Sequence, residues 1–425
     1  LRYYVYAYVT TDSYNTTARR TMSELEPKLV SLERQEVLFR GWIGTVAERS
    51  GALEAVLAGE GPATDHAFHL HETAEQSRYL MSVVEETLAS ELALSGARAW
   101  EKLQGVVTSQ LKVPFEQDGL VETLPITVVQ TMRSRPEEDV RRRAYEAELA
   151  GWESVREPLA ACLNGIKGAV NTLDRRRGRI DALHTALDQA RIDREILEAM
   201  LGAMRDSFPA FRRYWQTKAH LLGKESLPWW DLYAPVGNLE RRYSFAEARE
   251  MILEQLSTFS DRIAIFSRRA FDSDWIDAGP RDGKVGGAFC MRLPAVDESR
   301  ILCNFDGSLD EVLTLAHELG HAYHNECQVG KAPLQRRTPM TLAETASIFN
   351  ETLVTDAILA QAADEEEELA VLETFLIGAS QVVVDIHSRY LFETEVFERR
   401  AQAELSADDF CGIMLRAQKE TYGTG

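Results

Sequence analysis

The stretch that decides the fold is residues 309–325, which read LDEVLTLAHELGHAYHN. Its apolar residues recur at helical spacing and no proline interrupts them, so we predict a helix here. The five residues from His317 to His321, HELGH, match the pattern H-E-x-x-H. Residues four apart lie on one face of a helix, so the imidazoles of His317 and His321 can reach one point.

Two neutral imidazoles on one helical face are typical of a zinc site, and a catalytic zinc keeps one coordination position for water. Zinc lowers the pKa of its bound water towards neutrality, which makes a carboxylate an adequate base for that water. Glu318 directly follows the first histidine and is placed to take the proton. We therefore predict Zn²⁺ as the cofactor, His317 and His321 as metal ligands, and Glu318 as the catalytic base.

The third metal ligand must come from another stretch of the chain. The metzincin pattern would require glycine at 324 and histidine at 327, whereas this chain has His324 and Cys327. A second predicted helix, after Pro339, carries Glu344 and Glu351, which are two turns apart and share a face. One could bind the metal while the other accepts the N–H of a ligating histidine. We favour Glu344 as the ligand, with Glu351 as the alternative.

The motifs HELGHAYH and ETASIFNE resemble the oligoendopeptidase F branch of the thimet-oligopeptidase-like zinc metallopeptidases. The resemblance covers most of the chain and is strongest from about Trp275 onward. Further matching motifs are WID at 275–277, KVGGAFC at 284–290, DIHSRY at 385–390 and ETYG at 420–423.

This resemblance implies that His317, His321 and Glu344 bind zinc, that Glu318 is the general base, and that Glu351 lies beside a ligating histidine. It also implies a mainly α, zincin-type fold, with helical halves flanking a deep channel and a small sheet beside the zinc helix. The expected organisation is an N-terminal helical region, 1–190, and a catalytic zincin region, 191–425.

The chain departs from the family pattern at its ends. It begins at Leu1 without an initiator methionine, and it stops at Gly425, before a family segment whose histidine and tyrosines stabilise the oxyanion. We therefore expect a fragment that lacks both ends and is C-terminally incomplete in its catalytic region. Losing one oxyanion donor typically costs on the order of 10²–10³ in rate.

Two other stretches bear on peptide binding. Residues 286–293 and 300–305 predict two short strands joined by a hairpin-length loop, just before the zinc helix. An exposed edge there could bind an extended peptide by strand addition, and the glycines would leave that edge open. The alternative is an edge that only packs on the helix. The tyrosine-rich residues 1–20 are expected to form a helix whose aromatic side chains pack internally.

Composition indicates which partners and which cellular setting to expect. A formal net charge of −20 argues against nucleic acid or an anionic membrane surface as a partner. No uninterrupted run of 18 apolar residues is present, so we expect no transmembrane helix and no membrane partner. The chain has 5 cysteines, an odd number at wide spacing, which suggests no disulfide framework and favours a cytoplasmic setting.

Together these patterns predict a zinc-dependent endopeptidase whose partners are short peptide substrates. Two alternatives remain open at this point. One is a zinc carboxypeptidase of similar fold, and the other is a zinc-binding helical fragment that is catalytically silent because its C-terminal part is absent.

Overall fold

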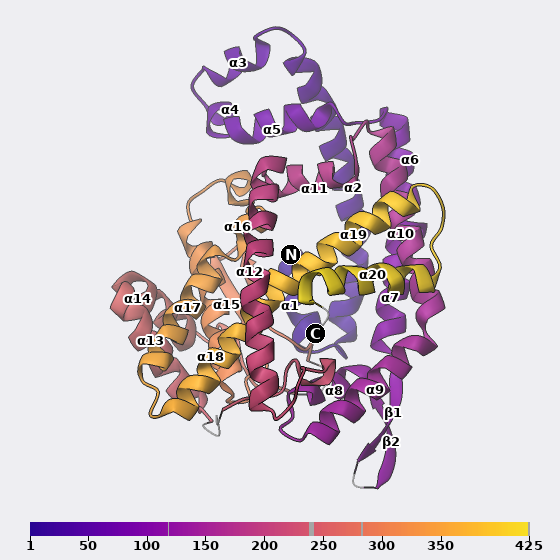
Figure 1. Cartoon of the computed structure of the whole chain (residues 1–425). Coiled ribbons are helices and arrows are strands. Elements are labelled where there is room, and N and C mark those ends of the chain that lie inside the picture. Colours follow the sequence, from indigo (N-terminus) through magenta and orange to yellow (C-terminus); the bar gives the residue numbers. More distant parts are fainter. Residues whose placement is uncertain (118, 238–241, 282–283, 424–425) are drawn as a thin grey trace. The chain divides into compact units, whose positions relative to one another are not determined.

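The structure is a computed structural model that describes residues 1–117, 119–237, 242–281 and 284–423 (Figure 1). It confirms the predicted mainly helical class. The chain forms two compact units, one made of Leu1–Val83 and Asn238–Val371 and the other of Val84–Gly237 and Leu372–Gly425. The predicted linear division after residue 190 matches neither unit, because each unit joins helices that are far apart in the sequence.

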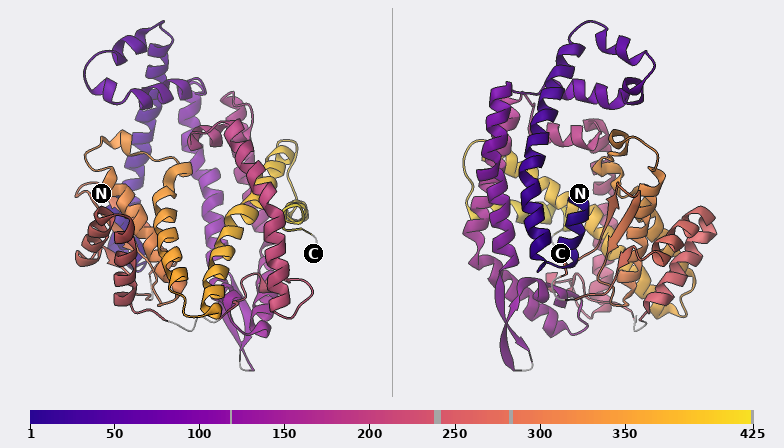
Figure 2. Two further views of the ribbon diagram at one scale, coloured as in Figure 1. Left: turned by 60° about the vertical axis from the view of Figure 1, so that its left-hand side comes forward. Right: turned by 180° about the vertical axis from the view of Figure 1, so that it is seen from behind.

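The first unit contains residues 309–325, the stretch with the H-E-x-x-H pattern. Its main helices are α1 (Arg2–Thr11), α2 (Thr16–Ala47), α3 (Ala52–Leu57), α4 (Pro62–Asp65), α5 (Ala67–Ser77), α13 (Phe245–Phe259), α14 (Asp261–Asp272), α15 (Leu309–Cys327), α16 (Met340–Ala343) and α17 (Thr345–Ala360). In Figure 2, α2 is the long indigo helix, and α5 packs back against it.

The first unit also holds the predicted sheet. Its strands are β3 (Ile276–Asp277), β4 (Phe289–Leu293) and β5 (Glu298–Leu302). β5 is central, parallel to β3 and antiparallel to β4, with Cys290 opposite Ile301. The predicted hairpin is therefore confirmed, and β4 is an edge strand of the sheet.

Helix α15 forms where the sequence predicts it, for identifiable local reasons. The hydroxyl of Ser308 accepts a hydrogen bond from the backbone N–H of Glu311 and caps the helix, and Asp310 adds a negative charge in its first turn. Its apolar face is buried in the main core together with β5, α13, α14 and α17. The contributing α15 residues are Leu309, Val312, Leu313, Leu315, Ala316, Leu319 and Ala322.

The second unit is built from helices and one hairpin. Its elements are α6 (Val83–Ser95), α7 (Ala97–Ser109), β1 (Lys112–Gln117), β2 (Leu120–Pro125), α8 (Ile126–Thr131), α9 (Glu138–Ser154), α10 (Arg156–Arg176), α11 (Ala182–Ala190), α12 (Arg194–Leu221), α19 (Ile386–Arg400) and α20 (Ala407–Tyr422). Helix α18 (Glu365–Ser380) begins in the first unit and continues into the second, where a π-helical turn, Gln381–Asp385, joins it to α19.

Buried charges tie the second unit together. Asp231 is fully buried, and its carboxylate accepts hydrogen bonds from Arg141 at 3.0 and 2.7 Å. Lys224 also pairs with Asp231. Lys218, 1% exposed, donates to the backbone carbonyl of Leu232 and forms an ion pair with Glu373 of α18. Removing one partner of such a pair would leave an uncompensated buried charge.

His387 is a second unusual feature of this unit. Its side chain is 1% exposed and, among the described residues, neither ring nitrogen has a hydrogen-bond partner. The ring lies edge-on to that of Phe208, with centroids 5.2 Å apart. Burial lowers the pKa of His387, the charge of Arg205 adds to this, and Glu420 and Glu198 oppose it.

One helical run bears on the expected absence of a membrane-spanning segment. By length and composition, the run Glu365–Arg400 is apolar enough to cross a membrane. We expected no such helix from the sequence, because acidic residues such as Glu373 and Asp385 interrupt the apolar residues of this run. A single helix of this kind is weak evidence for a membrane, because the core helix of a protein without a membrane can have the same length and composition. Glu373 here accepts a hydrogen bond from Tyr214 in addition to its ion pair.

Candidate metal centre

The crossing of α15 and α17 brings the predicted ligands together. The two helices lie side by side (Figure 1). Gly320 makes their close approach possible, because a Cβ at that position would lie 2.4 Å from the carbonyl oxygen of Ala346 and 2.6 Å from the Cα of Ser347. Glu344 is the residue directly before α17, and the close crossing places its carboxylate against the histidines of α15.

The three predicted ligands offer one converging set of atoms. Glu344 Oε2 lies 3.0 Å from His317 Nε2 and 3.1 Å from His321 Nε2. Ligand atoms of the three residues all lie within 4.8 Å of one another. Atoms that share one zinc ion at about 2.1 Å lie within about 4.2 Å of each other, so small adjustments suffice for this set to hold the ion. The two nitrogen and one oxygen donors are chemically those of a catalytic zinc site.

Glu351 occupies the other side of His317. Its Oε2 lies 3.0 Å from His317 Nδ1. When Nδ1–H donates to this carboxylate, Nε2 keeps its lone pair and points to the cluster with Glu344. The geometry therefore favours Glu344 over Glu351 as the metal-binding carboxylate and gives Glu351 the orienting position.

Ser347 is a site residue that the sequence analysis missed. Its hydroxyl lies 2.8 Å from Glu344 Oε2, and the residue is fully buried. Burial raises the pKa of Glu344, but the hydrogen bond from Ser347 and the charges of His321 and His317 outweigh burial, so the net shift is downward. The hydroxyl thus favours the ionised carboxylate, which is the form that binds metal. The feature of the sequence that could have identified Ser347 is a serine three residues after the predicted ligand, at the start of a helix.

The two imidazoles have different electrostatic surroundings. Burial lowers the pKa of His321, and this effect prevails over the nearby charge of Glu344. Burial also lowers the pKa of His317, but the hydrogen bond to Glu351 and the charges of Glu318, Glu351 and Glu344 outweigh it, so that pKa is raised. His321 is therefore neutral at pH 7 and has a lone pair available for a metal.

Glu318 lies on the same helix and points into a poorly solvated position. It is 5% exposed, and its Oε2 atom has no hydrogen-bond partner in the described part of the chain. Burial raises the pKa of Glu318 to about 7, with the charge of Glu344 adding to the effect and His317 opposing it. Buried polar atoms normally have partners, so this oxygen is suited to receive a proton from a bound small molecule.

The edge strand β4 is held to α15 by polar contacts. Asn325 donates to the Ser299 hydroxyl at 3.1 Å and to the Cys290 sulfur at 3.8 Å. Asn304 donates to the carbonyl oxygens of Val285 and Gly287, at 3.1 and 2.9 Å, and so fixes the glycine segment before β4. The sequence analysis identified the strands, but not the two asparagines that position them.

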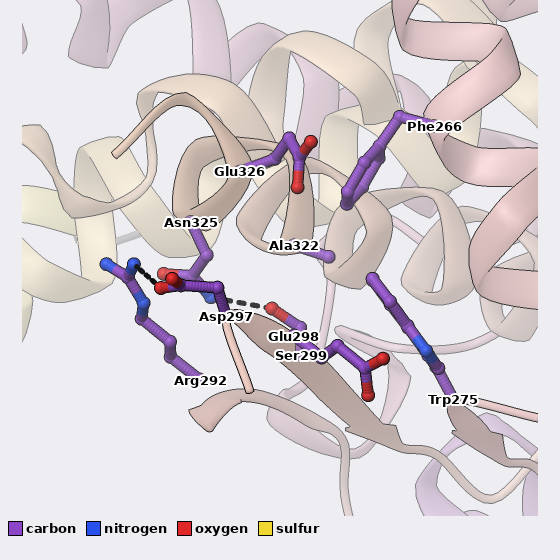
Figure 3. Close-up of a pocket in the computed structure, with 9 residues that line it drawn as sticks. All are labelled: Phe266, Trp275, Arg292, Asp297, Glu298, Ser299, Ala322, Asn325 and Glu326. Atoms are coloured by element: carbon purple, nitrogen blue, oxygen red, sulfur yellow. Dashed lines mark hydrogen bonds and ion pairs between the residues drawn. The ribbon is translucent and has the colours of Figure 1, made fainter. Parts of the chain in front are cut away.

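A small pocket lies beside this hairpin (Figure 3). The residues that line it are Phe266, Trp275, Arg292, Asp297, Glu298, Ser299, Ala322, Asn325 and Glu326. They include none of the predicted metal ligands, and their polar groups pair with neighbours, as Arg292 does with Asp297 at 2.9 Å. The residues that line this pocket therefore support the sheet.

Comparisons with known proteins identify the family of the chain. The model of peptidase family M3 matches residues 131–424. A chromosomal oligoendopeptidase F of Lactococcus lactis subsp. cremoris is 26% identical over 317 residues, which cover 74% of this chain and 52% of that protein. The group B oligopeptidase PepB of Streptococcus agalactiae is 25% identical over 353 residues, covering 82% of this chain and 58% of that protein. The chain thus spans a little over half of these relatives.

Solved structures show the same fold. The crystal structure of oligoendopeptidase-F from Enterococcus faecium superposes with a TM-score of 0.72 at 18% identity, covering 99% of this chain and 70% of that one.

Proposed function

Because the chain belongs to peptidase family M3, we propose that it is the catalytic part of a zinc-dependent endopeptidase that hydrolyses internal bonds of short peptides. The observation that carries the proposal is the convergence of His317, His321 and Glu344 beside Glu318, whose Oε2 atom has no hydrogen-bond partner among the described residues. The names of the relatives as oligoendopeptidases and oligopeptidases support the substrate class.

The residues divide the work as follows. His317, His321 and Glu344 would hold zinc, which when bound supplies Lewis acidity towards the scissile carbonyl and a lowered pKa for water. Glu318 accepts the proton of the attacking water and passes it to the leaving amine. A pKa of about 7 suits both transfers near neutral pH. Glu351 fixes the orientation of His317.

The edge of β4 offers a way to orient the substrate. An extended peptide can pair its backbone with a free strand edge, which sets its register independently of its side chains. β4 lies beside the zinc helix through Cys290 and Asn325. Pairing there would hold the scissile bond near Glu318 while other bonds of the peptide stay out of reach.

The primary test is Glu318→Gln, assayed for zinc content and for cleavage of an internally quenched peptide. We expect zinc to be retained and chelator-sensitive cleavage to be lost. Glu326→Gln is the matched control on the same helix, because Glu326 pairs with Arg269 and is not part of the His317, His321 and Glu344 cluster. Full turnover by a zinc-loaded Glu318→Gln protein would remove Glu318 as the base.

The metal assignment has a separate test. Glu344→Ala should weaken zinc retention, because it removes the only carboxylate of the three-residue cluster. Unchanged zinc affinity in this variant would move the third ligand to Glu351 or elsewhere.

The two alternative functions are separated by products and by chain length. A zinc carboxypeptidase would release single C-terminal residues, whereas an endopeptidase produces internal fragments. A catalytically silent fragment would bind zinc stoichiometrically without cleavage, and activity would appear only in a chain extended at its C-terminus.

A further inference from the structure

The exposed tyrosines of α1 are not explained by packing. We expected these side chains to be internal, but Tyr3 is 52% exposed and Tyr6 is 46% exposed. Tyr4 and Tyr8 are similarly exposed, and their hydroxyl groups lie 3.2 Å apart. A row of half-exposed aromatic rings is typical of binding surfaces, because tyrosine combines a large apolar face with a polar tip.

Helix α1 is fixed along the start of β4. The backbone N–H of Val285 donates to the carbonyl oxygen of Thr10 at 2.9 Å, and Arg281 donates to the carbonyl oxygen of Thr11 at 2.9 Å. Nearer the helix start, the ring of Tyr6 contacts that of Phe289, with centroids 6.0 Å apart. The contacts advance from Arg281 to Phe289 as they retreat from Thr11 to Tyr6, so α1 runs antiparallel to the segment that leads into β4.

The two faces of β4 meet different partners. Cys290 points to α15, where it accepts the hydrogen bond from Asn325. Successive side chains of a strand point to opposite faces, and the neighbouring Phe289 accordingly contacts α1 through Tyr6. The edge of β4 thus lies between α15 on one side and Tyr6 of α1 on the other.

That edge is open in the described part of the chain. β4 pairs only with β5 among the described strands. Gly286 and Gly287, directly before β4, are exposed, and a Cβ at either position would have no described atom within 4 Å. Space is therefore available beside the glycine segment that leads into β4.

We propose that Tyr6, together with Tyr3 one helical turn away, forms an aromatic wall that contacts every second side chain of a peptide substrate bound along β4. The proposal rests on the proposed peptidase function and adds a specificity determinant to it. Side chains of a bound extended peptide alternate between the α15 side and the α1 side. The wall would favour apolar and aromatic side chains at the positions that face α1.

The test measures binding, so that it does not depend on turnover. Fluorescent peptides that carry leucine or glycine at each position in turn are titrated into the zinc-loaded Glu318→Gln protein. We expect a preference for leucine on the order of tenfold at alternate positions of one parity. Tyr6→Ala should abolish this preference, and Tyr6→Phe should keep it because the ring remains.

Tyr8→Ala is the matched control, since Tyr8 lies on the same helix two residues away and so points to the opposite side. This control should keep the leucine preference of the parent protein. An unchanged preference in Tyr6→Ala, or equal losses in Tyr6→Ala and Tyr8→Ala, would overturn the wall, as would a failure of all peptides to bind.

Binding and cleavage measurements together distinguish an incorrect aromatic-wall proposal from an incorrect endopeptidase proposal. Peptide binding with the expected alternation, but without cleavage by the unmodified chain, would keep the wall and remove the endopeptidase activity. Chelator-sensitive cleavage with no effect of Tyr6→Ala on peptide preference would keep the activity and remove the wall.

Discussion

Replacing Gly320 with alanine should force α15 and α17 apart and weaken metal binding. The added Cβ would lie 2.4 Å from the carbonyl oxygen and 2.8 Å from the carbonyl carbon of Ala346, and 2.6 Å from the Cα of Ser347. Ordinary van der Waals contact begins at 3.4 Å, so the helices must separate by about 1 Å. All three neighbours are backbone atoms of α17, so no change of side-chain rotamer can relieve the contact.

The change in the free energy of unfolding caused by Gly320→Ala can be estimated from two opposing effects. Overpacking of a well-packed site typically costs about 1–3 kcal/mol. Alanine also favours the helix over glycine by about 1 kcal/mol, which offsets part of that cost. We therefore expect the free energy of unfolding of the metal-free protein to fall by at most about 2 kcal/mol.

Metal binding should be more sensitive than stability. Glu344 approaches the histidines from the start of α17, and Ser347, which holds its carboxylate, is one of the displaced residues. Metal–ligand distances tolerate changes of only about 0.2 Å, so a shift of about 1 Å is large. We expect zinc affinity to fall by about 10–100-fold, the range seen when a ligand loses its support.

The assay is chelator competition for zinc, with denaturant unfolding of the metal-free protein measured in parallel. Gly41→Ala is the matched control, because Gly41 lies inside α2 and a Cβ there has no described atom within 4 Å. That control should bind zinc normally and be slightly more stable, by about 0.4–1 kcal/mol. A Gly320→Ala protein that behaves like the control would refute the close-crossing argument.

Three further outcomes are expected. Ser347→Ala should lower zinc affinity on the order of tenfold in chelator competition while leaving metal-free unfolding nearly unchanged, and unaltered affinity would contradict the role of its hydroxyl. The folded-state pKa of His387 lies below its ordinary 6.5, so stability that is present above about pH 6.5 should be lost as the pH falls, by at most about 1.4 kcal/mol per pH unit. His387→Phe should remove this one-proton dependence in pH-resolved unfolding, whereas His220→Gln, at an exposed position, should not. Asp231→Ala should cost about 3–5 kcal/mol in denaturant unfolding because it removes the carboxylate that pairs with the buried guanidinium of Arg141, against less than about 1 kcal/mol for the largely exposed Asp408→Ala.

Part of the candidate site was readable from the sequence because it is local. His317, Glu318 and His321 belong to one helix, and helical geometry alone places the two imidazoles on one face. The strands of the hairpin beside this helix were also predictable, since apolar residues and a short loop define them. The choice of Glu344 over Glu351 needed more, because both share a face and only packing shows which one meets Nε2.

The tertiary structure decided what depends on contacts between distant segments. In the sequence Gly320 is one of the two variable positions of the H-E-x-x-H pattern, whereas in the structure it is the position that allows α17 to approach α15 closely. The tyrosines of α1 suggested packing, yet the fold leaves them half-exposed, with Tyr6 beside β4, which pairs only with β5 among the described strands. The sequence by itself determined the helical class and predicted the candidate metal-binding helix with its candidate base, because those follow from periodicity and spacing within one element. The contacts of Glu344, Glu351 and Ser347 with the candidate ligands, and the exposure of the α1 tyrosines, were decided by packing between elements, which no local pattern encodes.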